Sequence, residues 1–187
     1  THFINPTNYI YAISKYTQQR VGIKKHFVVQ AIGEDAVMSA NVASREKKSL
    51  MVFVVGETAR ADHFSLNGYE RETNPELSKL DIFNFTQVHS CGTSTAVSVP
   101  CMFSMFPRED YSDKKGKTYE GLLDILQRAG VQVLWLDNNT DCKGTCLRVP
   151  HRDISKNQPG PFCDGNNCLD EALLADLARH QPDHIAV

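Results

Sequence analysis

The chain has 187 residues, with 20 lysines and arginines against 22 aspartates and glutamates, and a formal net charge of −2. This length is enough for one domain with its own hydrophobic core. The balanced charge excludes the strongly basic surface of a nucleic-acid-binding protein. No run of about 18 apolar residues, the length that spans a membrane, occurs in the sequence.

The first element that the sequence predicts is a helix over Asn5–Arg20, because Asn5-Pro6-Thr7 is a plausible helix start. Its apolar face consists of Tyr9, Ile10, Ile13 and Tyr16. Such a helix packs against a core or lies on a lipid surface, and the short apolar face favours packing against a core. Residues 31–49 are polar and mixed, and they predict a connector.

Strands and helices are predicted to alternate after the connector. Leu50–Val55 is a continuous apolar run, as in a strand that is buried on both faces. A helix is predicted over Thr118–Gly130, with the glycine as its stop signal, and a strand follows at Val131–Leu136. A last helix covers Leu169–Arg179, before a strand that begins at Ile185. This order predicts an α/β fold, a mainly parallel sheet with helices on both faces.

The six cysteines fall into three close sequential pairs, Cys91/Cys101, Cys142/Cys146 and Cys163/Cys168. An even number of cysteines in local pairs predicts three disulfides and an oxidising compartment. Zinc ligation is the alternative, because Cys142-Lys-Gly-Thr-Cys146 has ligand-like spacing. The wider spacing of the third pair favours disulfides over a zinc knuckle.

Polar residues follow two of the predicted strands. Glu57 comes after the first strand, and Asn138 and Asn139 follow the strand that ends at Leu136. Open α/β sheets place their functional sites at the carboxyl ends of strands. The ordinary interpretation of a glutamate in this position is a helix cap or a surface residue.

The segment between Cys91 and Cys101 carries the hydroxyl residues Thr93, Ser94 and Thr95. Thr95 precedes an apolar stretch and could open a helix, whose N-terminus favours an anion. A metal ion held partly by Glu57 could activate the hydroxyl, since zinc lowers the pKa of bound water from about 15.7 to about 7. This arrangement favours phosphoryl or sulfuryl transfer, although clusters of serine and threonine are often plain N-caps.

Six blocks of sequence carry a resemblance to a known family. They are Gly56-Glu57-Thr58-Ala59-Arg60, Asn67-Gly68-Tyr69, Ser90 to Ala96, Ser98 to Ser104, Leu136-Asp137-Asn138-Asn139 and Asp141-Cys142-Lys143-Gly144. The blocks resemble the lipid A phosphoethanolamine transferases, in the group that includes the mobile colistin-resistance enzymes. The resemblance extends from the N-terminus to the end of the chain.

The resemblance implies a periplasmic catalytic domain of alkaline phosphatase/sulfatase-like fold, joined to transmembrane helices in the bacterial inner membrane. The implied reaction takes phosphoethanolamine from phosphatidylethanolamine and places it on a phosphate of lipid A, which confers polymyxin and colistin resistance. The implied cofactor is zinc. We expect a monomer that has no nucleic-acid partner and that reaches the membrane through a transmembrane region preceding the chain.

The resemblance also implies roles for single residues. Thr95 matches the nucleophile, which is phosphorylated in the intermediate and ligates zinc, and Glu57 matches another zinc ligand. Asn139 and Lys143 match residues that contact the phosphoethanolamine group. These roles suit their chemistry, because a lysine offers a point charge to a phosphate and an asparagine offers amide hydrogen bonds.

The chain departs from the family at its C-terminal end. The later Asp-His-Gly and Gly-Ser-His-Gly-Pro motifs, which carry the remaining zinc ligands, have no counterpart, and His63 and His89 match no family ligand. We therefore expect residues 1–48 to form a membrane-proximal helix and connector. Residues 49–187 are expected to form the first half of the catalytic domain, truncated at its C-terminus and inactive alone.

Two other functions stay open at the level of sequence. One is a periplasmic binding domain that is held together by disulfides and has lost its activity. The presence of Glu57 together with Thr95 argues against such a loss. The other is a sulfatase or phosphoglycerol transferase, but the Cys-x-Pro-x-Arg context of sulfatases is not found around Thr95.

Overall fold

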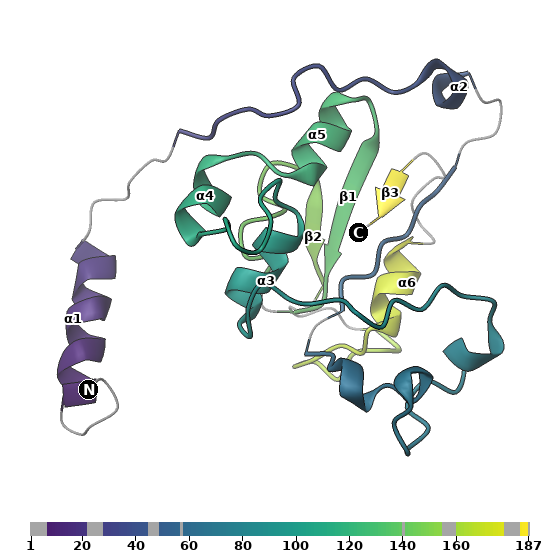
Figure 1. The fold of residues 1–187 in the computed structure, drawn as a ribbon, viewed down its shortest axis with the longest axis horizontal. Helices are drawn as coiled ribbons and strands as arrows, with labels where there is room; N and C mark the ends of the chain where they lie inside the picture. Colours follow the sequence, from purple (N-terminus) through teal and green to yellow (C-terminus); the bar gives the residue numbers. More distant parts are fainter. Residues whose placement is uncertain are drawn as a thin grey trace.

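A parallel sheet lies at the centre of the structure, which is a computed structural model. The structure describes residues 7–21, 28–44, 49–56, 58–139, 141–154, 160–177 and 184–186. The described strands are β1 (Gln132–Asp137), β2 (His151–Asp153) and β3 (His184–Ala186), in the order β2-β1-β3. Both pairings are parallel, and Figure 1 shows β1 between the two shorter strands. The predicted α/β class with a parallel sheet is confirmed.

The described helices surround this sheet, except for α1, which lies apart from it (Figure 1). The α-helices are α1 (Thr7–Val21), α2 (Ala40–Ala43), α3 (Thr95–Met102), α4 (Asp113–Thr118), α5 (Leu122–Arg128) and α6 (Glu171–Leu177). Three short 3-10 helices, η1 (Ala61–His63), η2 (Ser65–Asn67) and η3 (Leu77–Lys79), lie between α2 and α3. None of the helices within these described ranges is both long and apolar enough to cross a membrane.

The hydrophobic core forms where α3 and α5 meet β1. Its buried residues are Val99, Phe103, Leu123, Val133, Trp135, Cys142, Cys146 and Val149. The Phe103 ring contacts the Trp135 ring edge to face, with the centroids 5.6 Å apart. Because both half-cystines belong to this core, the loop that the Cys142–Cys146 disulfide closes packs against the sheet.

The predicted helix over Thr118–Gly130 begins later than expected, at Leu122 in α5. The chain before it pairs with the connector, since the Glu120 N–H donates to Gln30 O at 3.0 Å. Asp124 then caps α5, accepting the Gly121 N–H at 2.8 Å. The predicted glycine stop at Gly130 is confirmed, because Gly130 has a left-handed backbone with φ of 88°.

The prediction of a strand at Leu50–Val55, buried on both faces, is wrong. Within the described residues, this segment forms no strand, and Val52 alone takes part in a β-bridge. Phe53 contacts Phe103 with ring centroids 5.9 Å apart, and Val55 packs against the core. Val54, between them, is 83% exposed. Met51 and Phe53 are also exposed, at 63% and 44%, so neither face of the segment is buried, and an apolar run alone does not reveal whether neighbours cover it.

The N-terminal helix is confirmed as α1, but the expectation that it packs against a core is wrong. The side chains of its apolar face, Tyr9, Ile10, Ile13 and Tyr16, are all exposed. The connector over residues 28–44 separates α1 from the sheet (Figure 1). Four apolar residues at the end of an extended connector give too little area to hold a helix against the core.

The C-terminal elements match the sequence more closely. The predicted strands at Val131–Leu136 and Ile185 are confirmed as β1 and β3, and the last predicted helix as α6. The strand β2 was not predicted, because His151–Asp153 is a three-residue polar segment without an apolar pattern. The division into residues 1–48 and 49–187 stays a prediction.

Candidate active site

Thr95 is the first residue of α3, as the sequence predicted. Ser94 precedes the helix with an extended backbone, and its carbonyl oxygen accepts the N–H groups of Val97 and Ser98, each at 2.9 Å. The Ser94 side chain makes no capping hydrogen bond. The hydroxyl cluster is therefore not a simple N-cap at Ser94, and the first turn of α3 presents its N–H groups beside Thr95.

All six cysteines are paired in disulfides, and the alternative of zinc ligation by cysteine is wrong. The pairs are Cys91–Cys101, Cys142–Cys146 and Cys163–Cys168, as predicted. The first disulfide joins the segment ahead of Thr95 to the last turn of α3, where Cys101 is buried. The disulfide therefore constrains both the segment before Thr95 and the C-terminal end of its helix.

Lys143 lies in the loop that the second disulfide closes. Its backbone is left-handed, with φ of 51°, and Gly144 follows with φ of 92°. The Lys143 N–H donates to Asp141 Oδ1 at 2.6 Å, and its Nζ lies 3.2 Å from the same oxygen. The Lys143 side chain is 21% exposed. The ammonium group is thus held near the surface of a rigid loop.

Asn139 and its neighbour Asn138 have different surroundings at the end of β1. The Asn138 side chain donates to the Cys168 carbonyl oxygen at 2.9 Å and to Asp170 at 2.8 Å, so it ties β1 to the segment before α6. Asn139 is exposed, and its N–H donates to Asp137 Oδ1 at 2.7 Å. Asn138 therefore has a structural role, whereas Asn139 is exposed at the end of β1.

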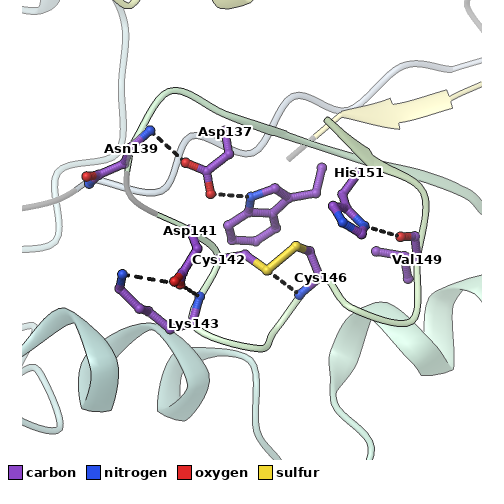
Figure 2. Close-up of a disulfide and its surroundings, with 9 residues drawn as sticks. Asp137, Asn139, Asp141, Cys142, Lys143, Cys146, Val149 and His151 are labelled. Carbon is purple, nitrogen blue, oxygen red and sulfur yellow. Dashed lines mark hydrogen bonds and ion pairs between the residues drawn. A yellow bond between two sulfur atoms is a disulfide. The ribbon is translucent and has the colours of Figure 1, made fainter. Parts of the chain in front are cut away.

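Figure 2 shows Asn139 and Lys143 on one side of the Cys142–Cys146 disulfide, with Val149 and His151 on the other. His151 is turned away from the two candidate residues and has Nδ1 3.0 Å from Val149 O. Asn139 and Lys143 thus both lie on the segment that follows β1, and their roles in binding stay predictions.

Two non-glycine residues of the described chain have a positive φ, and both adjoin predicted site positions. One is Lys143, and the other is Thr58, with φ of 53°, directly after Glu57. A left-handed backbone is unfavourable for L-residues other than glycine, above all for a β-branched one, and such strain concentrates at functional sites. Glu57 itself lies outside the described residues.

A cavity of about 720 Å³ is lined by residues of α3 and of the disulfide loop. Ala96 and Lys143 are among them, whereas Thr95 is not. Asn139 is not among its lining residues. Three further cations line the cavity, namely Lys115, Lys117 and Arg148. Arg148 pairs with Asp124, Lys115 donates to Asp110 O at 2.7 Å, and Lys143 itself pairs with Asp141.

The described part of the chain contains no group of three or more histidine, cysteine, aspartate or glutamate side chains that could hold a metal ion. His63 packs edge to face on Tyr69, with ring centroids 4.9 Å apart, and His89 is exposed. His63 thus packs on a neighbouring ring and His89 lies at the surface. Arg60 and Asp62 form the expected ion pair, at 2.6 Å.

Asp137 and Asp141 were not recognised as part of the site from the sequence. Each accepts the N–H of the residue two positions later, Asn139 and Lys143 respectively. An aspartate two residues before a polar residue is the only signal of such an Asx turn, and it is too common to identify one alone.

Comparisons with known proteins identify relatives of this chain. The sulfatase family matches residues 49–183. Phosphoethanolamine transferase EptA of Escherichia coli (strain K12) is 46% identical over 178 residues, covering 95% of this chain and 32% of the relative. Phosphatidylethanolamine transferase Mcr-1 of Escherichia coli is 42% identical over 185 residues, covering 94% and 34%. The chain thus spans about a third of the length of these relatives.

A solved structure agrees with these sequence matches over the whole chain. It is the integral membrane protein lipooligosaccharide phosphoethanolamine transferase A (EptA) from Neisseria meningitidis, with a TM-score of 0.82 and 41% identity. The match covers 100% of this chain and 35% of that chain. The predicted sulfatase-like fold and the resemblance to phosphoethanolamine transferases are confirmed, and the chain belongs to the sulfatase family.

Proposed function

We propose that this chain carries the nucleophile of an enzyme that moves phosphoethanolamine from phosphatidylethanolamine to a phosphate of lipid A. The observation that carries the proposal is the placement of Thr95 at the first position of α3, because the next residue of this helix, Ala96, lines the same cavity as Lys143. A helix N-terminus and a lysine that adjoin one cavity both favour an anionic phosphate there. The names of the relatives support the same chemistry.

In the proposed reaction, Thr95 Oγ1 attacks the phosphorus of phosphatidylethanolamine and loses its proton. The bond from phosphorus to the diacylglycerol oxygen breaks, and this oxygen takes up a proton. An oxygen of a lipid A phosphate then attacks the phosphorus of the phosphothreonine, the bond from phosphorus to Thr95 Oγ1 breaks, and Oγ1 takes up a proton to restore the hydroxyl. This scheme replaces one displacement between two lipids by two steps, each at the same side chain. Lys143 and Asn139 hold the phosphate in both steps.

Zinc is part of the proposal, with Glu57 and Thr95 as two oxygen ligands. Protein zinc sites usually have four ligands, so these residues supply half of a set and do not complete a site. When bound to Thr95, zinc would lower the pKa of the hydroxyl. The roles of Lys143 and Asn139 depend on hydrogen bonding and charge alone.

The proposed location is the periplasmic side of the bacterial inner membrane, and the proposed consequence of the reaction is resistance to colistin. Three disulfides support an oxidising compartment. The similarity to an integral membrane protein supports the membrane location. We propose that the protein acts as a monomer, which brings its site to two lipids in turn.

The first prediction concerns Thr95 in the full-length protein. Incubation with phosphatidylethanolamine should leave phosphoethanolamine on the peptide that contains Thr95, detected by mass spectrometry. Thr95→Ala should lower transfer to lipid A at least about 10³-fold, because the intermediate cannot form. Thr93→Ala is the matched control, since it removes an exposed hydroxyl two residues earlier, and it should retain transfer.

Two results would contradict this proposal. Wild-type protein that forms no adduct would exclude the phosphothreonine intermediate, and a Thr95→Ala variant that still modifies lipid A would exclude the residue. Hydrolysis of an aryl sulfate without transfer would instead favour a sulfatase. The same set of assays thus separates the proposed function from its alternatives.

A further inference from the structure

We propose that Asp137 and Asp141 are positioning residues. Each orients one residue, Asn139 or Lys143, by accepting a hydrogen bond from the backbone N–H of that residue. The inference rests on the proposed function, in which Asn139 and Lys143 hold the transferred phosphate. It assigns to the two aspartates the task of fixing this pair before the substrate arrives.

The same hydrogen-bond arrangement occurs at both positions. Asp137 Oδ1 accepts the Asn139 N–H at 2.7 Å, and Asp141 Oδ1 accepts the Lys143 N–H at 2.6 Å. Each bond spans two residues and closes an Asx turn, which fixes the backbone of the residue that follows. The two turns follow one another on the same loop (Figure 2). Each candidate substrate-binding residue is thus preceded by its own carboxylate.

Both aspartates are connected to the buried core. The second oxygen of Asp137, Oδ2, accepts the Trp135 Nε1–H at 3.2 Å, and Trp135 is buried in the core. Asp141 precedes Cys142, whose disulfide with Cys146 is buried in the same core. A turn anchored in this way transmits the rigidity of β1 to Asn139 and Lys143.

The backbone of Lys143 depends on this support more than the backbone of Asn139 does. Its left-handed backbone, with φ of 51°, is unfavourable for a lysine and persists only when its surroundings hold it. Asp141 supplies this constraint twice, because it accepts the N–H and also lies 3.2 Å from Nζ. The carboxylate therefore sets both the direction of the side chain and the place of its charge.

Substitutions by alanine and by asparagine separate these contributions. Asp137→Ala and Asp141→Ala remove the acceptor and open the turn. Asp141→Asn keeps an acceptor oxygen for the Lys143 N–H and removes the negative charge near Nζ. Asp164→Ala is the matched control, because Asp164 Oδ1 accepts the Asn166 N–H at 2.8 Å in the separate Cys163–Cys168 loop.

The experiment measures transfer kinetics and amide hydrogen exchange of the full-length protein. Asp137→Ala and Asp141→Ala should lower kcat/KM by about 100-fold, because a misplaced binding group loses that much. Amide exchange at Asn139 or Lys143 should become faster in the respective variant. Asp141→Asn should recover slow exchange and most of the activity, a rescue that general damage to the fold would not show. Asp164→Ala should change kcat/KM by less than about twofold.

Each outcome decides the question. If the alanine variants keep wild-type kinetics and exchange, or if Asp164→Ala lowers activity equally, the positioning role is wrong. If an alanine variant fails to fold, Asp141→Asn still tests the charge near Nζ through kinetics and the turn through exchange. If wild-type protein transfers no phosphoethanolamine, the proposed function fails, while amide exchange still decides whether the aspartates hold the two residues.

Discussion

Asp124 links the N-terminus of α5 to the segment after the second disulfide. It is 8% exposed, and Arg148 donates to both of its carboxylate oxygens at 2.7 Å. Burial by itself raises the pKa of Asp124, but the hydrogen bonds from Arg148 and from the Gly121 N–H outweigh it and hold the pKa below its ordinary value of 3.8. The ionised carboxylate therefore stabilises the folded state.

Asp124→Asn should lower the free energy of unfolding by about 1–2 kcal/mol at neutral pH, a value reduced by the partial exposure of Arg148. A group whose pKa is depressed by folding stabilises above its unfolded pKa, and this contribution is lost as pH falls through the folded pKa. The difference between wild type and variant should thus be constant near neutrality and shrink below about pH 4. Urea unfolding at several pH values measures it.

The control for this prediction is Asp62→Asn. Asp62 also pairs with an arginine, Arg60, at 2.6 Å, but both side chains are exposed. An exposed ion pair is screened by water and salt, so the variant should unfold like the wild type. Equal losses in the two variants would show that burial is not what makes the Asp124 pair important.

At the scale of elements, the contact between the end of α3 and the start of α5 depends on Gly121. The Leu122 N–H donates to Phe103 O at 2.8 Å, which joins the C-cap of α3 to the first residue of α5. A Cβ on Gly121 would lie 2.8 Å from this same carbonyl oxygen. The φ of −122° at Gly121 suits any residue, so close approach explains the glycine rather than conformational freedom.

Gly121→Ala should lower the free energy of unfolding by about 1–3 kcal/mol, because the new methyl group pushes α3 and α5 apart. The matched control is Gly160→Ala, where a Cβ would meet nothing within 4 Å, and it should stay within about 0.5 kcal/mol of wild type. Chemical denaturation of both variants makes the comparison. A Gly121→Ala protein as stable as the control would mean that the junction relaxes at little cost.

The elements also show how far the sequence predicts this fold. The pattern of β1 was sufficient, because its buried residues are consecutive and a glycine stop precedes it. The run at residues 50–55 was misleading, since its apolar composition does not state which neighbours cover it. β2 was missed because its residues are polar and its place comes from pairing with β1. In both segments, contacts with residues distant in the sequence determine whether a strand forms, and a local pattern does not reveal these contacts.

For the candidate site, the apolar stretch after Thr95 indicated that this residue opens a helix, which α3 confirms. The choice of Thr95 among three hydroxyls came from the family resemblance, as did Lys143, whereas Asn139 was also indicated by its place after a strand. The left-handed backbone at Lys143 could not be predicted, because lysine rarely adopts it and asparagine or glycine is the usual choice. It depends on a disulfide and a carboxylate acting together.

At the scale of the whole molecule, two small disulfide loops allow stability and activity to be separated. Replacing both Cys142 and Cys146 by alanine should cost about 2 kcal/mol of unfolding free energy, and so should replacing Cys163 and Cys168. Only the first pair closes the loop of Lys143. The first double variant should therefore lose transfer activity, while the second should retain it after correction for unfolded protein.

Thermal unfolding and transfer assays on the two double variants measure this difference. Equal activity in both would show that the first loop holds Lys143 without its disulfide. Loss of activity in both would show that the disulfides matter for overall stability alone.

The three disulfides have a property that concerns the making of the protein rather than its activity. Their partners are 10, 4 and 5 residues apart, and in each case the partner is the next cysteine along the chain. A polypeptide that enters an oxidising compartment from its N-terminus exposes each cysteine just before its correct partner. Oxidation in order of emergence thus gives the native pairing without disulfide shuffling, and each closed loop shortens the search of the remaining chain for its fold.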